Sequence, residues 1–296
     1  MSEVSHRFVV LILMLCALAP RAQGQHTQTS PEDAAFLNEV RENLSRAEQL
    51  AHLYSYKERR TDVHANPFGR IGTGDTRVLE VYPSPNRQLT FRRVIERDGV
   101  PVPDAELREQ EREYQQRATD IHARLSTEGF DARTARERDE AAARQRAKNR
   151  LDDILRVLVF NVKSHEVRNG VETVVVTFQG RPDAEPMTRE GRMAKSFKGT
   201  IWIHDKAREL MDVEAVTTDD IAFGGFIARI SDGTRTTMTR REVAPGVWMP
   251  TRVTFNGEGR VLLFRKLKID YLVEWFDYRK MTPGASVGGF DPGVER

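Results

Sequence analysis

The sequence has little that would support a cross-linked or metal-clustered protein. Its 296 residues include a single cysteine, Cys16. One cysteine excludes both an intramolecular disulfide framework and a zinc site built from cysteines. A chain of this length buries roughly 70% of the surface that its unfolded form exposes, so it can hold a core without such links. We therefore expect a fold stabilised by packing alone.

An excess of charge of one sign is also missing. The chain has 46 Lys and Arg against 44 Asp and Glu, a net charge of +2. Proteins that bind nucleic acids usually carry a concentrated basic excess, so we expect no nucleic-acid partner. The composition, 39% hydrophobic and 30% charged residues, is typical of a soluble globular protein.

Long hydrophobic runs are confined to the amino terminus. Residues 1–24 resemble a secretory signal, with an apolar run over residues 8–18, a break at Pro20, and small residues in Ala22-Gln23-Gly24 before the expected cleavage site. The run is shorter than the about 20 apolar residues that a membrane-spanning helix needs. An uncleaved membrane anchor is the alternative. Removal of the signal also removes Cys16, and we expect the cysteine-free chain in the periplasm.

Catalytic signatures are absent from the sequence. It contains no Gly-x-Ser-x-Gly motif and no phosphate-binding loop. The histidines lack metal-ligand spacing, and the neighbouring acids Asp219 and Asp220 point to opposite faces of a strand. We therefore expect no enzyme, no cofactor and no metal. A hydrolase with dispersed catalytic residues is the weakest of the hypotheses.

Two regions have helical spacing. Residues 31–51 follow Ser30-Pro31-Glu32-Asp33, which combines a capping residue with proline at the first helical position, and their apolar residues recur every three or four positions. The pattern of residues 104–158 predicts two helices joined at 126–131, and we call this pair the charged helical hairpin. The Arg-rich stretch 133–150 is either a solvated face paired with the acidic start of this hairpin or a contact for anionic lipid headgroups.

Most of the remaining chain has the pattern of antiparallel strands separated by short turns. Asn169-Gly170 is the strongest hairpin signal, and Asn256-Gly257 is read as a further turn. Apolar residues alternate with polar ones in the last strand, which leaves one face apolar. Residues 181–197 are interpreted as a loop, and residues 281–296 as a disordered tail. The expected strands are 53–62, 77–82, 88–95, 160–168, 171–178, 199–204, 210–216, 225–230, 234–242, 247–255 and 261–278.

Several of these segments resemble a family of exported bacterial proteins. The segments are Gly199-Thr200-Ile201-Trp202-Ile203-His204-Asp205, Pro245-Gly246-Val247-Trp248-Met249-Pro250, residues 92–102 before the charged helices, residues 223–230 and residues 276–280. The chain over residues 31–280 is similar to the periplasmic lipoprotein carriers LolA and LolB and their relative RseB. It is more similar still to uncharacterised secreted proteins described as outer-membrane lipoprotein-sorting-like.

The resemblance implies an α+β fold. In this family a curved antiparallel β-sheet, an unclosed barrel, is covered by helices on its concave face, and here one such domain would span residues 25–280. In the lipoprotein carriers the apolar space between sheet and helices holds acyl chains. The long charged helices of residues 104–158 depart from the compact carriers.

These observations lead to two functional hypotheses. The first is a periplasmic carrier that binds lipid or lipoprotein acyl chains by sequestration and contacts a membrane transiently. The second is an envelope protein-interaction or stress-sensing module that has the same fold but a filled core, and that binds a protein partner through residues 104–158. Phe223 and Phe226 flank two glycines and form either a lip over the cavity mouth or a turn at the start of a strand. The candidate cavity-lining residues are Ile201, Ile203, Phe223, Phe226, Val253, Phe255, Tyr271, Val273 and Trp275.

Overall fold

The computed structural model describes residues 31–61, 70–71, 74–223, 228–261 and 265–281. The expected signal peptide and nearly all of the expected tail lie outside these residues. The described chain divides into two compact units, each built from three separate stretches. The single domain expected over residues 25–280 stays a prediction, because one long strand contributes residues to both units.

Unit 1 comprises residues 1–47, 63–74 and 146–272. Its strands follow the order β14-β13-β12-β9-β8-β7-β6, with β10 and β11 paired beside β13 and β2 beside β14. Its elements are α2 (Pro31–Leu50), β2 (Arg70–Ile71), the end of α4 (Phe130–Arg156), β6 (Leu158–Arg168), β7 (Val171–Gly180), α5 (Arg189–Lys195), β8 (Phe197–His204), β9 (Glu209–Thr217), β10 (Ile221–Phe223), β11 (Ala228–Ile230), β12 (Arg235–Ala244), β13 (Val247–Val261) and the first half of β14 (Arg265–Lys280).

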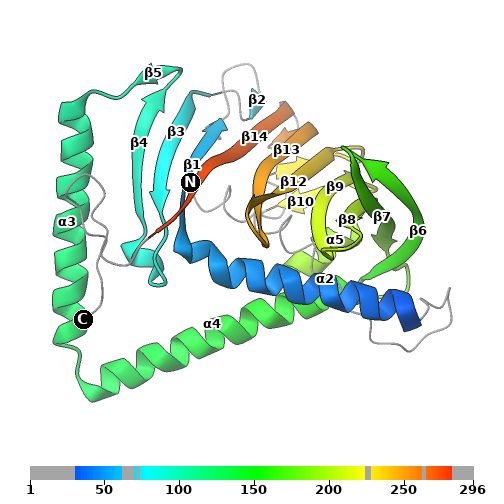
Figure 1. The fold of residues 1–296 in the computed structure, drawn as a ribbon, viewed down its shortest axis with the longest axis horizontal. Helices are drawn as coiled ribbons and strands as arrows, with labels where there is room; N and C mark the ends of the chain where they lie inside the picture. The colour runs from blue at the N-terminus through cyan, green and yellow to red at the C-terminus, as the bar shows by residue number, and fades with distance from the viewer. Residues whose placement is uncertain (1–30, 62–69, 72–73, 224–227, 262–264, 282–296) are drawn as a thin grey trace. The chain divides into compact units, whose positions relative to one another are not determined.

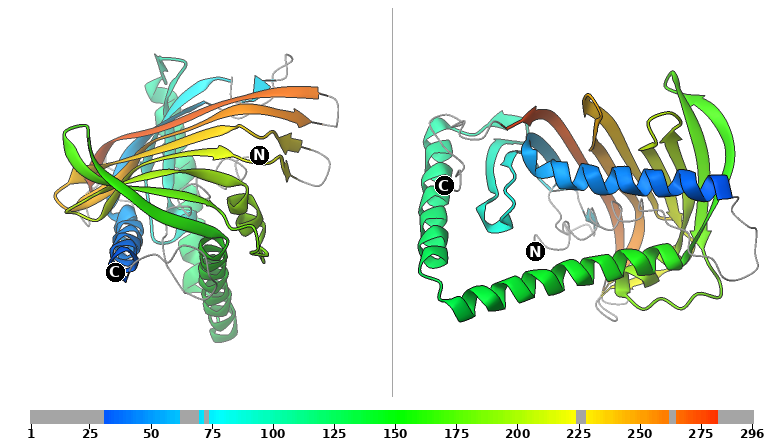
Figure 2. Two further views of the ribbon diagram at one scale, coloured as in Figure 1. Left: turned by 90° about the vertical axis from the view of Figure 1, so that its right-hand side faces the viewer. Right: turned by 60° about the horizontal axis from the view of Figure 1, so that its bottom comes forward.

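The sheet of unit 1 is curved, and helices cover one side of it. Figure 2 shows its strands arching over α2 and the end of α4, which lie on the concave side. Apart from the two-residue strand β2, its strands pair antiparallel. Strand β6 has no further neighbour among the described strands, so the sheet is not closed into a barrel. The α+β class with an open, curved antiparallel sheet is therefore confirmed.

Unit 2 comprises residues 48–62, 75–145 and 273–296. Its strands follow the order β5-β4-β3-β1-β14. Its elements are β1 (Tyr54–Thr61), β3 (Thr76–Tyr82), β4 (Phe91–Arg97), β5 (Val100–Pro101), α3 (Asp104–Ser126), the first part of α4 and the second half of β14, with short 3-10 helices at Ala51–Leu53 and Arg87–Leu89 (Figure 1).

A small aromatic cluster anchors α3 to the sheet of unit 2. The rings of Tyr82 and Phe91 stack, and the ring centroids of Phe91 and Tyr114 are 4.6 Å apart. The Tyr114 hydroxyl donates a hydrogen bond of 2.6 Å to the carbonyl of Leu89. This bond satisfies the polar end of a side chain that is otherwise buried.

Two tight turns join neighbouring strands. The backbone φ angles are +49° and +79° at Asp98 and Gly99, and +53° and +78° at Asn169 and Gly170. A two-residue type I′ hairpin turn needs positive φ at both central residues, which Asn, Asp and Gly adopt most readily. The hairpin signal at Asn169-Gly170 is therefore confirmed.

Two local predictions are wrong. Residues 181–197 are not all loop, because Thr188 caps the short helix α5 by accepting a hydrogen bond of 2.9 Å from the Gly191 N–H. Asn256-Gly257 is not a turn but part of the continuous strand β13. A Cβ on Gly257 would lie 2.2 Å from the Thr234 hydroxyl oxygen, so glycine is needed there for close packing rather than for a turn.

The two charged helices form close to their expected bounds. α3 ends at Ser126 and α4 begins at Phe130. They do not pack as the antiparallel hairpin that the sequence suggested, because α4 leads away from α3 instead of folding back along it (Figure 1). Nearly all of the described side chains from 131 to 149 are exposed, so this stretch lacks the apolar stripe that helix pairing requires.

Candidate binding face

A row of buried apolar side chains crosses five neighbouring strands of unit 1. Cross-strand pairing places them directly opposite one another in the order Val176, Ile201, Val213, Met238 and Val253. Each is at most 3% exposed. Directly paired residues share one face of a sheet, so this row defines the face that the helices cover.

Flanking rows extend this face in both directions along the strands. On one side, Phe178 and Phe255 are buried at the two ends of a row that passes through Gly199. A Cβ on Gly199 would lie 2.8 Å from the Phe178 ring, so the missing side chain makes room for that ring. On the other side, Ile203 and Leu210 pair and have no exposed surface. We call these three rows the apolar face.

Helix α2 covers the apolar face through a few side chains. Its buried residues are Leu37, Val40 and Ala47, which recur at helical spacing. The rest of the helix is partly or fully exposed. The amphipathic pattern predicted from the sequence is therefore confirmed, and its buried stripe is narrow.

Polar contacts hold α2 to the turn between β8 and β9. The Asn43 side-chain amide donates to the carbonyls of Ala207 and Arg208, at 3.0 and 3.1 Å. The Arg208 guanidinium pairs with Glu39 at 3.2 Å and lies 4.6 Å from the centroid of the Phe36 ring. The backbone φ of Arg208 is +54°, so the chain turns at this residue, between β8 and β9.

The predicted lining residues fall into three groups. Ile201, Ile203, Val253 and Phe255 lie together on the apolar face, and Tyr271 is buried on the part of β14 that belongs to unit 1. Val273 and Trp275 are buried in unit 2. Phe223 ends β10, and Phe226 lies outside the described residues. Whether any of them lines a ligand cavity stays a prediction.

In unit 2, Trp275 has a polar partner that the sequence analysis missed. Its indole N–H donates to Glu58 at 3.2 Å, and the two residues are directly paired across β1 and β14. Glu58 is 6% exposed and also pairs with Arg60 at 3.4 Å. The alternation of Tyr54, Tyr56 and Glu58 along β1 was the available signal, since it puts this carboxylate on the same face as a tyrosine.

Three members of the central row were not predicted from the sequence: Val176, Val213 and Met238. Their strands were expected, but no face was assigned to them. Three successive valines at 174–176 hide the period of two, whereas Asp212 and Glu214 alternate with Val213 and Ala215 and were the available signal for the face of Val213. The register with Ile201 places Val176 and Val213 on the apolar face.

A buried ion pair lies two positions beyond Met238 on β12. Arg240 is 2% exposed, donates to the carbonyl of Trp248 at 2.7 Å and pairs with Glu209 at 3.4 Å. Burial raises the pKa of Glu209, while Arg240 and the nearby Arg46 on α2 act in the opposite direction. This pair places charge beside an otherwise apolar interior.

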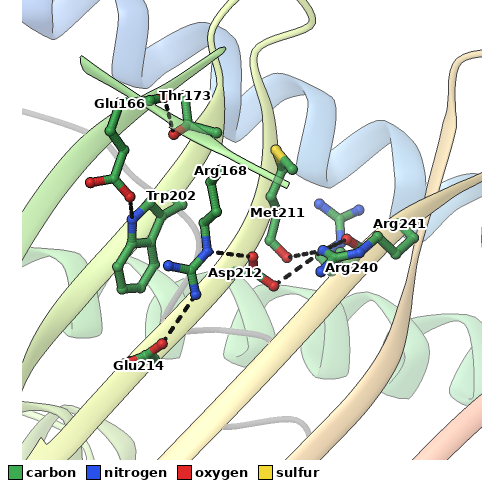
Figure 3. A network of polar contacts seen from close by, with 9 residues as sticks. All are labelled: Glu166, Arg168, Thr173, Trp202, Met211, Asp212, Glu214, Arg240 and Arg241. Carbon is green, nitrogen blue, oxygen red and sulfur yellow. Dashed lines mark hydrogen bonds and ion pairs between the residues drawn. The ribbon is translucent and has the colours of Figure 1, made fainter. Parts of the chain in front are cut away.

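The opposite face of the sheet carries a polar network (Figure 3). Arg168 lies 3.9 Å from the centroid of the Trp202 ring and pairs with Asp212 at 3.0 Å and Glu214 at 3.1 Å. Asp212 also pairs with Arg241 at 3.1 Å. Every cation here has a carboxylate partner, so the network ties neighbouring strands together rather than presenting unpaired charge.

The described part of the chain contains neither a candidate membrane-spanning helix nor a cluster of metal ligands. No helix there is long and apolar enough to cross a membrane. No three His, Cys, Asp or Glu side chains in the same residues come together as metal ligands.

Comparison with known proteins adds little. The sequence matches no protein-family model and no curated protein. A solved structure of a DUF1329 family protein from Desulfovibrio piger resembles it distantly, with 9% sequence identity, a TM-score of 0.27, and coverage of 82% of this chain and 93% of the other. At this similarity the match supports no conclusion about function.

Proposed function

We propose that this protein is an exported carrier that binds lipid or lipoprotein acyl chains by sequestration. The apolar face of unit 1 is the binding surface in this proposal, and α2 is its movable cover. One observation carries the proposal: α2 covers this face with only three buried side chains, Leu37, Val40 and Ala47.

Simple energetics support displacement of α2 by an acyl chain. Fully burying a leucine or valine side chain contributes about 1.5–3 kcal/mol, so Leu37 and Val40 together contribute about 3–6 kcal/mol. Each acyl methylene transferred from water contributes about 0.8 kcal/mol, so a chain of about 15 methylenes gains about 12 kcal/mol. The gain from the ligand exceeds the loss from separating these side chains.

The polar contacts of α2 oppose this displacement modestly, since the two Asn43 hydrogen bonds add about 0.5–1.5 kcal/mol each. Glu39 and Arg208 form an ion pair with side chains 58% and 35% exposed. Exposed ion pairs contribute about 0–1 kcal/mol, because water screens them and ordering two long side chains has an entropic cost. The helix is therefore held mainly by its narrow apolar stripe.

Native mass spectrometry and uptake of a fluorescent fatty acid test the proposal. Protein purified from a bacterial periplasm is expected to carry a lipid mass and to take up the probe. Ile201→Phe, which adds volume on the apolar face, should abolish uptake, whereas Thr200→Phe on the opposite face should retain it. Thermal unfolding of both variants controls for folding. Bare protein that takes up no probe would refute the carrier.

A protein-interaction module with a filled core is the alternative. It is favoured by the complete burial of Ile201 and Ile203, since a side chain with 0% exposure has protein atoms on all sides. If the protein is such a module, we expect it to be free of lipid and to crosslink to a specific partner through residues 104–158. The same mass spectrum separates the two functions.

A further inference from the structure

Two segments of unit 1 that are close to each other have a local excess of positive charge. Residues 146–156, at the end of α4, and residues 181–198, around α5, contain nine Lys and Arg against five Asp and Glu. The whole chain has a net charge of only +2. The two segments together have a net charge of +4, whereas strand residues 235–268 of the same unit have eight Lys and Arg against two acids.

The two segments form one surface because α4 and the start of α5 are bonded to each other. Asp153 accepts hydrogen bonds from the backbone N–H groups of Met187 and Thr188, at 2.9 and 2.7 Å. The Arg156 guanidinium donates to the carbonyl of Glu185. Arg150 precedes Asp153 by three positions, so it lies on the same face of α4 as the bonded loop.

Further exposed cations extend this surface. Arg146 lies one turn before Arg150 on α4 and is exposed. Arg189 and Arg192 are three positions apart on α5 and are also exposed. Two of the five acids pair with cations of the same segments, Asp152 with Lys148 at 3.1 Å and Asp153 with Arg156 at 2.7 Å, which leaves seven Lys and Arg against three acids.

An exposed apolar side chain sits among these cations. Met187 is 74% exposed, although its backbone N–H is held by the buried Asp153 carboxylate. The loop is therefore fixed while its methionine projects into solvent. A fixed apolar residue on a surface that also carries exposed arginines matches a bilayer surface, where basic side chains meet anionic headgroups and an apolar side chain enters the boundary with the acyl chains.

We propose that this basic surface docks the protein on an anionic lipid bilayer. Charge complementarity identifies the partner as anionic, and Met187 favours a bilayer over a nucleic acid, which offers no apolar layer at its phosphates. Near an anionic membrane each Lys or Arg strengthens binding by a factor of about five. Three exposed arginines, Arg146, Arg189 and Arg192, together with the partly buried Arg150, thus suffice for reversible docking.

Sedimentation with lipid vesicles tests the proposal. The full chain should bind vesicles that contain one third phosphatidylglycerol in phosphatidylcholine, and bind pure phosphatidylcholine vesicles far more weakly. Arg189→Glu with Arg192→Glu should lower the binding constant about 25-fold or more, from the two lost cations alone. Raising the salt from about 0.05 to about 0.5 M should release the wild-type protein, because the Debye length shortens.

A matched control has the same change in net charge elsewhere. Arg108→Glu with Arg112→Glu replaces two exposed arginines on α3 and should leave vesicle binding nearly unchanged. An equal loss in this control, equal binding to both kinds of vesicle, or preferential binding of an acidic protein or duplex DNA would overturn the proposal. The carrier function is measured without vesicles, so the outcome of its test does not depend on the outcome of the vesicle experiment.

Discussion

The Asp153 carboxylate accepts two hydrogen bonds of 2.7 Å from Thr188, one from its backbone N–H and one from its hydroxyl. Asp153 has no exposed surface. The same Thr188 hydroxyl caps α5 by accepting from the Gly191 N–H. A single buried carboxylate thus fixes the end of α4 against the start of α5, and the basic surface depends on it.

Replacing this carboxylate should destabilise unit 1. Asp153→Asn keeps the side-chain volume but loses the charge and one acceptor oxygen, which leaves N–H groups of Met187 and Thr188 poorly satisfied. We expect a loss of about 3 kcal/mol in the free energy of unfolding, measured by urea denaturation. Asp152→Asn is the control, because Asp152 is largely exposed and should change stability little.

The Asp153 carboxylate also makes the free energy of unfolding depend on pH. Burial alone would raise the pKa of Asp153, but hydrogen bonds from the Thr188 hydroxyl, the Met187 and Thr188 N–H groups and Arg156 outweigh burial and lower the pKa below the ordinary 3.8. The folded pKa therefore lies below the unfolded pKa. Stability from Asp153 is fully present above the unfolded value and is lost as pH falls through the folded value.

Urea denaturation of wild type and Asp153→Asn over an acid series measures this dependence. The difference in unfolding free energy between the two proteins should be constant near neutral pH and shrink below pH 3.8. A difference that stays constant throughout the acid range would show that ionised Asp153 is not the stabilising form.

Two glycines offer a test of close packing. A Cβ on Gly191 would lie 2.1 Å from the Asp153 carboxylate oxygen, whereas a Cβ on Gly129 would meet nothing within 4 Å. Gly191→Ala should therefore lower the melting temperature by displacing the carboxylate. Gly129→Ala should cost only about 1 kcal/mol or less, because its Cβ meets open space and the loss is confined to the preference for glycine over alanine at the N-cap of α4. Similar effects of the two substitutions would contradict this packing.

The buried pair of Arg240 and Glu209 should show strong coupling. Arg240→Met alone leaves a buried carboxylate without its partner and should cost about 3–5 kcal/mol. The double variant Arg240→Met with Glu209→Leu removes both charges and should recover most of that loss. Equilibrium unfolding of the four proteins in this cycle gives the coupling energy, and simple additivity of the single losses would contradict a buried pair.

Regular elements were predictable where the local pattern agrees with the tertiary structure. The capping sequence before Pro31 and the spacing of Leu37 and Val40 predict α2 correctly, because capping and amphipathicity are properties of the helix itself. The Asn169-Gly170 turn follows from the backbone preferences of these two residues. Alternation from Ile269 to Trp275 likewise predicts which side chains of β14 are buried.

The remaining features depend on partners distant in the sequence. Gly257 looks like a turn residue, and only its contact with Thr234 explains a glycine inside a strand. Helix α5 has just seven residues, so a local pattern could not distinguish it from a loop, and its cap is reinforced by Asp153 from another helix. Of the candidate lining residues, the four on the apolar face belong together only through strand register.

The pairing of β1 with β14 has a consequence for how the chain folds during synthesis. Glu58 and Trp275 meet across 217 positions of sequence, and each compact unit draws on both early and late parts of the chain. Contacts of such separation form slowly, since a long loop must close before they are made. A nascent chain therefore has to be synthesised through β14 before either unit is complete, and deletion from residue 273 onward would leave β1 without one of its two neighbours.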